Sequence, residues 1–316
     1  MLLSLATDSQ AARLLLPSAH NLLFYKFKTD ARQVSIVALT DHTQTKGEIA
    51  NRLQPFKTFL STNCILGERM TGEKRTALIT GSGRNIGRAI ALALAKDGFN
   101  IVVNGSQDRD ACYKVAGEAQ RFGAEVLVAM GDVGVPENAK QIADDAIDKF
   151  GGVDVLVNNA AIRPSGGFLD MSIEEWNRVI DVDFSSAVWL ARACLPNMVA
   201  RNWGRIINFG GMNAMQGYAS RPHVTVAKHA AWGLTKTLAR EFGPNGITAN
   251  IISPGPIAGE RDDPAMAAHI ESQKSKIPLG RLGKPEEIAA TISLLVSAGG
   301  AFINGQLIQV NGGADT

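Results

Sequence analysis

The sequence predicts an α/β fold, a single doubly wound parallel sheet with helices on both faces, and three observations predict it. Short apolar runs recur from residue 74 onward, and helical stretches of ten or more residues separate them. Strands that alternate with helices in this way form βαβ crossovers, which build a parallel sheet covered on both faces. Residues 70–316 also have a suitable length for one such domain.

The expected strands and helices follow one another in order along this domain. The first apolar run, 76–80, ends at Gly81, and the Ala/Leu-rich helix 89–96 stops at Asp97-Gly98. Further buried strands are expected at 100–103, 125–129, 153–157, 205–209 and 248–252.

Residues 1–69 lack such a pattern, and three interpretations of this leader compete. A targeting peptide should have few acidic residues and many arginines; Asp8 is the only acid in the first 29 residues, but the basic set there is weak. A secretory signal should have a basic start, and two leucines directly follow Met1 instead. We favour a leader that is poorly ordered or lies upstream of a true start at Met70.

Composition excludes several classes of protein. The 32 Lys+Arg nearly balance the 30 Asp+Glu, and the small basic surplus comes from the leader, so no nucleic-acid partner is expected. The three cysteines are widely spaced, which indicates a reducing, cytoplasmic compartment. The chain contains no run of about 18 apolar residues, so no membrane helix is predicted. His229 and His269 have no partners at metal-ligand spacing, so no metal site is expected.

A glycine-rich turn predicts a nucleotide site. Residues 80–87, T-G-S-G-R-N-I-G, follow a strand and open a helix. Glycines there let the backbone approach a pyrophosphate that the helix N-terminus stabilises. Asp132-Val133, residues 158–161 and residues 254–257 end other strands, at the edge where parallel sheets bind ligands.

Taken together, these landmarks resemble the short-chain dehydrogenase/reductase family over residues 74–313. The matching residues are Thr80, Gly81, Gly87, Asp132, Asn158-Asn159-Ala160-Ala161, Lys228, Pro254-Gly255-Pro256-Ile257 and the tail from Asn304 to Gly313. The resemblance implies a nicotinamide cofactor, a small-molecule substrate and a homo-oligomer, either dimer or tetramer. Asn85 stands where the family has its second glycine, and Asn tolerates left-handed geometry better than most residues.

Charge favours NADP(H) over NAD(H) as the cofactor. The second strand ends in Asn104-Gly105-Ser106, without the carboxylate that binds the ribose hydroxyls of NAD. Arg84 lies in the glycine turn, where the resemblance places a basic residue in NADP-preferring members. The residues expected to bind the cofactor are Gly81, Arg84, Asn85, Ile86, Gly87, Ser106, Asp132, Val133, Asn159, Lys228, Pro254, Gly255 and Ile257.

The usual catalytic set of the family is mostly missing. The resemblance implies a Tyr as proton donor, a Lys that lowers its pKa, a Ser that positions the substrate and an Asn that holds a water relay. In this chain the Ser position is Gly211, the Tyr position is Val224 and the Asn position is Asp183, so only Lys228 remains. Valine transfers no proton, and the standard mechanism cannot operate unchanged.

Four residues are candidates to take over the role of the missing Tyr. His223 is next to the vacant Tyr position and has a suitable ordinary pKa. Tyr218 lies in the loop 212–221, which should border the pocket, and Asp183 is expected to pair with Lys228 or with His223. Thr225 can share the Lys228 helix face, but its hydroxyl is a poor acid. The predicted catalytic residues are Lys228, His223, Asp183 and Tyr218.

Three functions remain open at this point. The first is an NADP(H)-dependent oxidoreductase that acts on a small carbonyl, alcohol or alkene with a non-standard proton donor. The second is a cofactor-binding subunit that lacks turnover and assembles with an active homologue. The third is a lyase or hydrolase on the same scaffold. The polar segment 258–276, expected to cover the pocket, does not identify the substrate.

Overall fold

The computed structural model describes residues 11–13, 24–30, 33–38, 74–259, 272 and 274–315. The chain divides into two compact units, Met1–Ile65 and Leu66–Thr316. Most of the segment expected to cover the pocket, 258–276, lies outside the described residues.

The first unit contains a three-stranded antiparallel sheet in the order β1-β2-β3. These strands are β1 (Ala11–Arg13), β2 (Phe24–Asp30) and β3 (Gln33–Ala38). These three strands were not expected from the sequence, and the interpretation of residues 1–69 as a poorly ordered leader or one upstream of the true start stays a prediction. Tyr25 and Phe27 alternate with Lys26 and Lys28 in β2, a period of two that is typical of a strand.

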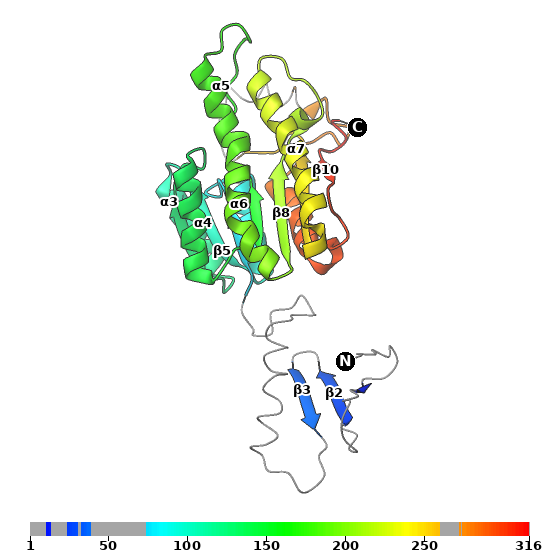
Figure 1. The fold of residues 1–316 in the computed structure, drawn as a ribbon. Helices are drawn as coiled ribbons and strands as arrows, with labels where there is room; N and C mark the ends of the chain where they lie inside the picture. The colour runs from blue at the N-terminus through cyan, green and yellow to red at the C-terminus, as the bar shows by residue number, and fades with distance from the viewer. Residues whose placement is uncertain are drawn as a thin grey trace. The chain divides into compact units, whose positions relative to one another are not determined.

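The second unit is built on one seven-stranded sheet, which confirms the predicted fold class (Figure 1). The strand order is β10-β9-β8-β7-β4-β5-β6, and every neighbouring pair is parallel. The strands are β4 (Thr76–Ile79), β5 (Asn100–Gly105), β6 (Val126–Met130), β7 (Val155–Asn158), β8 (Gly204–Phe209), β9 (Ile247–Pro254) and β10 (Leu307–Val310).

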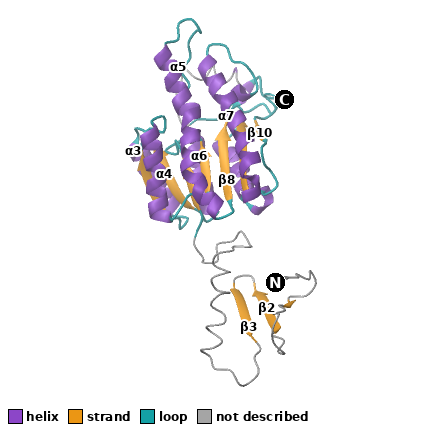
Figure 2. Ribbon diagram, viewed as in Figure 1, coloured by secondary structure: helices purple, strands orange, loops and turns teal. Residues whose placement is uncertain are grey.

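Helices cover both faces of this sheet (Figure 2). One core cluster packs α2 (Asn85–Lys96), α3 (Arg109–Gln120) and α9 (Pro285–Val296) on the sheet. The other packs α4 (Pro136–Phe150), α6 (Ser186–Ala200) and α7 (Pro222–Phe242). The α5 helix (Ile173–Ile180) runs into α6 through η1 (Asp181–Ser185), a single π-helical turn, and both α5 and η1 contact α7.

Parallel pairing brings the carboxyl ends of the strands to one edge of the sheet. The loop after β7 and the loop after β8 begin side by side there, because Asn158 pairs with Asn208 in register. A site built from strand-end residues is therefore possible at this edge. Within the described residues, no helix is long and apolar enough to cross a membrane, and no group of three or more His, Cys, Asp or Glu side chains is arranged to hold a metal ion.

Candidate active site

The glycine turn connects β4 to α2 and has the backbone geometry that the sequence predicts. Gly81 has a φ of +61° and Asn85 a φ of 48°, so the left-handed conformation expected at Asn85 is confirmed. A Cβ at Gly87 would lie 2.3 Å from the Gly81 carbonyl oxygen and 2.7 Å from Asn159 Nδ2. Only glycine lets α2 begin so close to the end of β4.

The N-terminus of α2 is open to a negatively charged ligand. Its first turn contains no acidic residue and its N-cap, Arg84, makes no side-chain cap, whereas Asp108 and Ser172 cap the α3 and α5 helices. The start of a helix carries the positive end of the helix dipole. The first turn of α2 thus fits a phosphate group.

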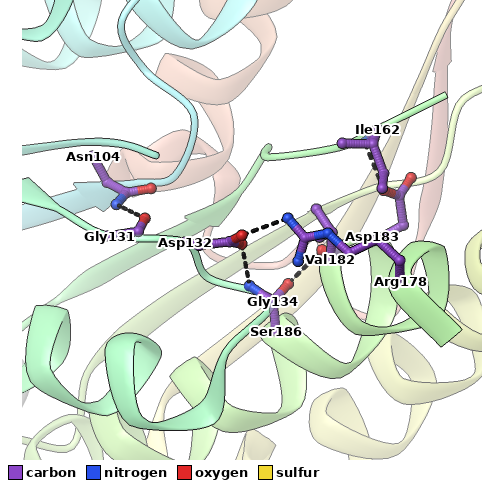
Figure 3. A network of polar contacts seen from close by, with 9 residues as sticks. All are labelled: Asn104, Gly131, Asp132, Gly134, Ile162, Arg178, Val182, Asp183 and Ser186. Carbon is purple, nitrogen blue, oxygen red and sulfur yellow. Dashed lines mark hydrogen bonds and ion pairs between the residues drawn. The ribbon is translucent and has the colours of Figure 1, made fainter. Parts of the chain in front are cut away.

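The side chains around the turn hold its shape. Asn104, at the end of β5, accepts from the Gly81 backbone N–H at 3.3 Å and donates to the carbonyl oxygens of Ala129 (2.9 Å) and Gly131 (3.1 Å) (Figure 3). Asn159 Nδ2 donates to the carbonyl oxygens of Thr80 (2.9 Å) and Gly81 (3.0 Å). Asn159 therefore stabilises the turn through two hydrogen bonds, and its role as a cofactor contact stays a prediction.

Arg84 and Ser106 lie on the solvent side of the same region. Both are exposed, and the described part of the chain offers the Arg84 guanidinium no hydrogen bond or ion pair. The turn and the end of β5 are tied together, because the Ser82 N–H donates to the Asn104 carbonyl at 2.8 Å. An uncompensated positive charge next to a strand end without a carboxylate suits a 2′-phosphate.

Asp132 follows β6, and other residues of the chain engage both of its carboxylate oxygens. Oδ1 accepts from the Gly134 N–H at 2.9 Å, and Oδ2 forms an ion pair with Arg178 of α5 (Figure 3). Val133, next in the chain, is buried. Arg178 was not expected from the sequence, because its partner is 46 residues away.

The remaining predicted cofactor residues lie at neighbouring strand ends. Ile86 is partly buried in the first turn of α2 and packs on the core. Gly255 follows β9 and fits closely against the tail, since a Cβ there would lie 2.6 Å from Asn311 Cα. Pro254 closes β9, and Ile257 makes an isolated parallel bridge with Gly283.

The central pair of the site is Lys228 and Asp183. Lys228 Nζ lies 3.1 Å from Asp183 Oδ2, and both side chains are almost completely buried. The Ile162 N–H donates to Asp183 Oδ1 at 2.8 Å (Figure 3). Of the two partners expected for Asp183, the structure pairs it with Lys228.

Burial lowers the pKa of the Lys228 ammonium from its ordinary value. The Asp183 carboxylate opposes this shift, and the positive charge of Arg163 adds to it. Asp183 lies in the π-helical turn η1, a feature that is frequent at functional sites. The pair is therefore a buried proton-bearing group whose acidity depends on two neighbouring charges.

His223 forms a second pair, separate from the first. Its Nε2 lies 3.0 Å from Glu175 Oε1, and its Nδ1 accepts the Val224 N–H at 2.9 Å. Because Nδ1 is an acceptor, the ring proton is on Nε2 and faces Glu175. His223 is buried, and its contacts are with Glu175 and Val224, not with Lys228.

Glu175 was not predicted from the sequence, although a topological signal for it exists. The helices α5 and α7 both follow parallel strands and belong to the same face of the sheet, so they run in the same direction and their first turns meet. A carboxylate early in α5 and a histidine early in α7 are then natural neighbours.

The other candidate positions are distributed around Lys228. Val224 is 2% exposed and occupies the Tyr position as a core residue. A Cβ at Gly211 would meet no atom within 4 Å, so there is space for a side chain. The φ of 67° would nevertheless strain any residue other than glycine. Tyr218 is 47% exposed, and the Arg221 guanidinium lies 5.4 Å from its ring centroid. Described contacts do not bring Tyr218 to Lys228.

Comparison with known proteins gives a family match over most of the second unit. A family model described as enoyl-(acyl carrier protein) reductase matches residues 81–315. The chain is 35% identical over 240 residues to a 3-oxoacyl-(acyl-carrier-protein) reductase of Staphylococcus epidermidis, covering 76% of this chain and 98% of the relative. It is 37% identical over 240 residues to the enzyme of that name from Synechocystis, covering 76% and 96%.

Solved structures agree with these matches. An acetoin dehydrogenase from Salmonella typhimurium superposes with a TM-score of 0.71 at 33% identity, covering 76% of this chain and 95% of that one. A putative gluconate dehydrogenase from Agrobacterium tumefaciens gives 0.70 at 33% identity, covering 77% and 96%.

Proposed function

Because the chain belongs to the short-chain dehydrogenase/reductase family of oxidoreductases, we propose that it is an NADP(H)-dependent oxidoreductase with a non-standard proton donor. Its substrate is a small molecule that carries a carbonyl, an alcohol or an alkene. The observation that supports this best is the combination of the uncapped α2 start beside unpaired Arg84 with the buried Lys228–Asp183 pair.

The residues present fit the cofactor. The first turn of α2 suits the pyrophosphate, and Arg84 with Ser106 suits the 2′-phosphate. When bound, the nicotinamide supplies or accepts the hydride. The chain must then provide the proton for the substrate oxygen, a task that typically contributes about 10²–10⁴ in rate.

Lys228 is the residue that we assign to this proton transfer. Its ammonium is more acidic than an ordinary lysine because burial lowers its pKa. Asp183 lies 3.1 Å from the amine and favours its protonated form, because its charge raises the pKa of Lys228 against the effect of burial. His223 takes a supporting role: with Glu175 it fixes the first turn of α7, the helix that carries Lys228.

The cofactor assignment is tested by titrating NADPH and NADH into wild type and Arg84→Ala. We expect wild type to bind NADPH at least tenfold more tightly than NADH, and Arg84→Ala to lose that preference with NADH affinity unchanged. Arg121→Ala, at the end of α3, is the matched control and should retain the preference. Tighter binding of NADH by wild type would reject NADP(H) as the cofactor.

The redox function is tested by following nicotinamide absorbance with a panel of carbonyls and alcohols. We expect turnover by wild type, loss of at least a hundredfold in Lys228→Met, and a partial loss in His223→Asn. Turnover that survives Lys228→Met would remove Lys228 from proton transfer.

The other two functions predict different results in that assay. The vacant positions at Gly211 and Val224 favour the second candidate, a cofactor-binding subunit that assembles with an active homologue. It predicts cofactor binding without turnover on any substrate. A lyase or hydrolase predicts product with no change in the cofactor. A cytoplasmic location and a homo-oligomer, either dimer or tetramer, complete the proposal; gel filtration with light scattering measures the latter.

A further inference from the structure

Two arginines lie on neighbouring strand-end loops, one next to the Lys228–Asp183 pair and the other about two helical turns before Lys228. Arg163 is in the loop that follows β7, and Arg221 is the N-cap of α7, at the end of the loop that follows β8. Arg163 is exposed and Arg221 is half-buried. Neither belongs to the cofactor or proton-transfer residues assigned above.

Hydrogen bonds fix Arg163 next to the pair. The residue before it, Ile162, donates its N–H to Asp183 Oδ1 at 2.8 Å, while the other oxygen of that carboxylate faces Lys228. The Arg163 charge is near enough to Lys228 to lower the pKa of its ammonium. Arg163 thus lies at the reactive end of the site.

The two arginine loops are also tied to each other. The Gly166 N–H donates to the Ser220 carbonyl at 2.9 Å, and Ser165 Oγ donates to the same oxygen at 3.4 Å. Ser220 is directly before Arg221 in the chain. The contact joins a segment two to three residues after Arg163 to the residue before Arg221.

Helix geometry places Arg221 on the same side of α7 as Lys228. The two are seven residues apart, which is about two turns of helix and roughly 20° from alignment. Thr225 lies between them, four residues after Arg221 and three before Lys228, on the same side. His223, by contrast, is about 140° away from Lys228 and faces α5 through Glu175.

Two buried polar atoms on this side have no hydrogen bond within the described residues, although the Arg221 guanidinium also lies 5.4 Å from the Tyr218 ring centroid. No carboxylate in the described residues pairs with the guanidinium of Arg163 or Arg221. Arg221 Nε and Thr225 Oγ1 are both buried without a hydrogen bond in the described structure. The two acids described at this site are already engaged, Asp183 by Lys228 and Glu175 by His223. Buried polar atoms without partners are costly, and a ligand that supplies acceptors removes that cost.

We propose that the substrate carries an anionic group, a carboxylate or a phosphate, which Arg163 and Arg221 bind while its carbonyl or hydroxyl lies at Lys228. Planar guanidinium groups pair with such anions through two parallel hydrogen bonds, so two arginines give orientation as well as affinity. Thr225 Oγ1 supplies a further donor on the same side of α7. This inference rests on the proposed function for the position of the reacting group, but the anion site itself does not.

The experiment compares matched pairs of probes that differ in the anion. Acetoacetate is paired with methyl acetoacetate, and dihydroxyacetone phosphate with dihydroxyacetone. Each is given to wild type, to Arg163→Gln/Arg221→Gln and to Arg240→Gln, an exposed arginine near the far end of α7. Two quantities are measured: kcat/KM with NADPH, and the shift in melting temperature caused by each probe with and without cofactor.

For at least one pair, we expect wild type to show a kcat/KM at least tenfold higher with the anionic probe than with its neutral partner, or to be stabilised by the anionic probe at a concentration at least tenfold lower. That preference should disappear in Arg163→Gln/Arg221→Gln and persist in Arg240→Gln, with the NADPH dissociation constant unchanged in both. The pair that shows the preference distinguishes carboxylate from phosphate. Equal response to neutral and anionic probes, a preference that survives the double substitution, or no response to any anionic probe in protein that binds NADPH would overturn the proposal.

Failure of the proposed function gives a different pattern. In that case the protein neither binds NADPH nor turns over any probe, but its melting temperature still rises with an anionic probe when both arginines are present. This result would support the anion site and reject the redox function.

Discussion

Lys228 occupies an unusual chemical position for a lysine. Its amine is buried, which disfavours the charged form, and one carboxylate within 3.1 Å favours that form. Removal of either partner would leave the other charge buried alone, a change that typically costs about 3–5 kcal/mol. Each member of the pair therefore depends on the other for its stability, and the neighbouring charges shift the pKa of Lys228.

The pH dependence of carbonyl reduction should report these charges. Reduction requires the ammonium form, so the rate falls as pH rises through the Lys228 pKa. Asp183 raises that pKa, so Asp183→Asn should move the alkaline limb of kcat/KM to lower pH. Arg163 lowers the pKa, so Arg163→Gln should move the limb to higher pH.

The control for this pH experiment is Asp181→Asn. Asp181 is a carboxylate in the same π-helical turn, but it is not among the charges that shift the pKa of Lys228, so the substitution should leave the limb in place. Shifts of both variants in the same direction, or unchanged limbs in both, would show that the limb belongs to another group.

At the scale of elements, the sheet and its edge could be predicted, whereas the contacts between helices could not. Apolar runs and the glycine turn are local signals. They identified six of the seven strands of the sheet to within a few residues, but not β10, and they predicted the left-handed backbone at Asn85. Glu175 and Arg178 act through partners 48 and 46 residues away, and no local pattern specifies such pairs.

The contact between α5 and α7 also explains why the direction of the His223 side chain could not be predicted from the sequence. The sequence gives only the spacing of five residues between His223 and Lys228. At that spacing, the relative direction of the two side chains depends on where the helix begins. The helix begins at Pro222, so His223 already has helical geometry and faces α5. The extra residue of the π-helical turn lies where Asp183 meets Lys228, and nothing in the local residue pattern predicts it.

At the scale of the whole molecule, the two units have separate structural bases. The seven-stranded sheet extends from Thr76 to Val310, and the buried residues of its two described core clusters lie between Ala77 and Val296. The three strands of the first unit pair only with one another in the described structure. The cofactor turn, the Lys228–Asp183 pair and both substrate arginines are all in the second unit.

We therefore expect residues 70–316 to fold and bind NADPH without residues 1–69. The melting temperature of 70–316 should lie within about 2 °C of that of the sheet domain in the full chain, a difference that corresponds to roughly 1 kcal/mol or less in a domain of this size. Calorimetry and NADPH titration of both proteins measure this, and the N-terminal mass of the native protein shows where the mature chain begins. A native chain that starts at Met1 and resists protease up to residue 69, together with loss of NADPH binding on truncation, would make the first unit an integral part of the enzyme. Unchanged binding instead places every group needed for the proposed chemistry after residue 69.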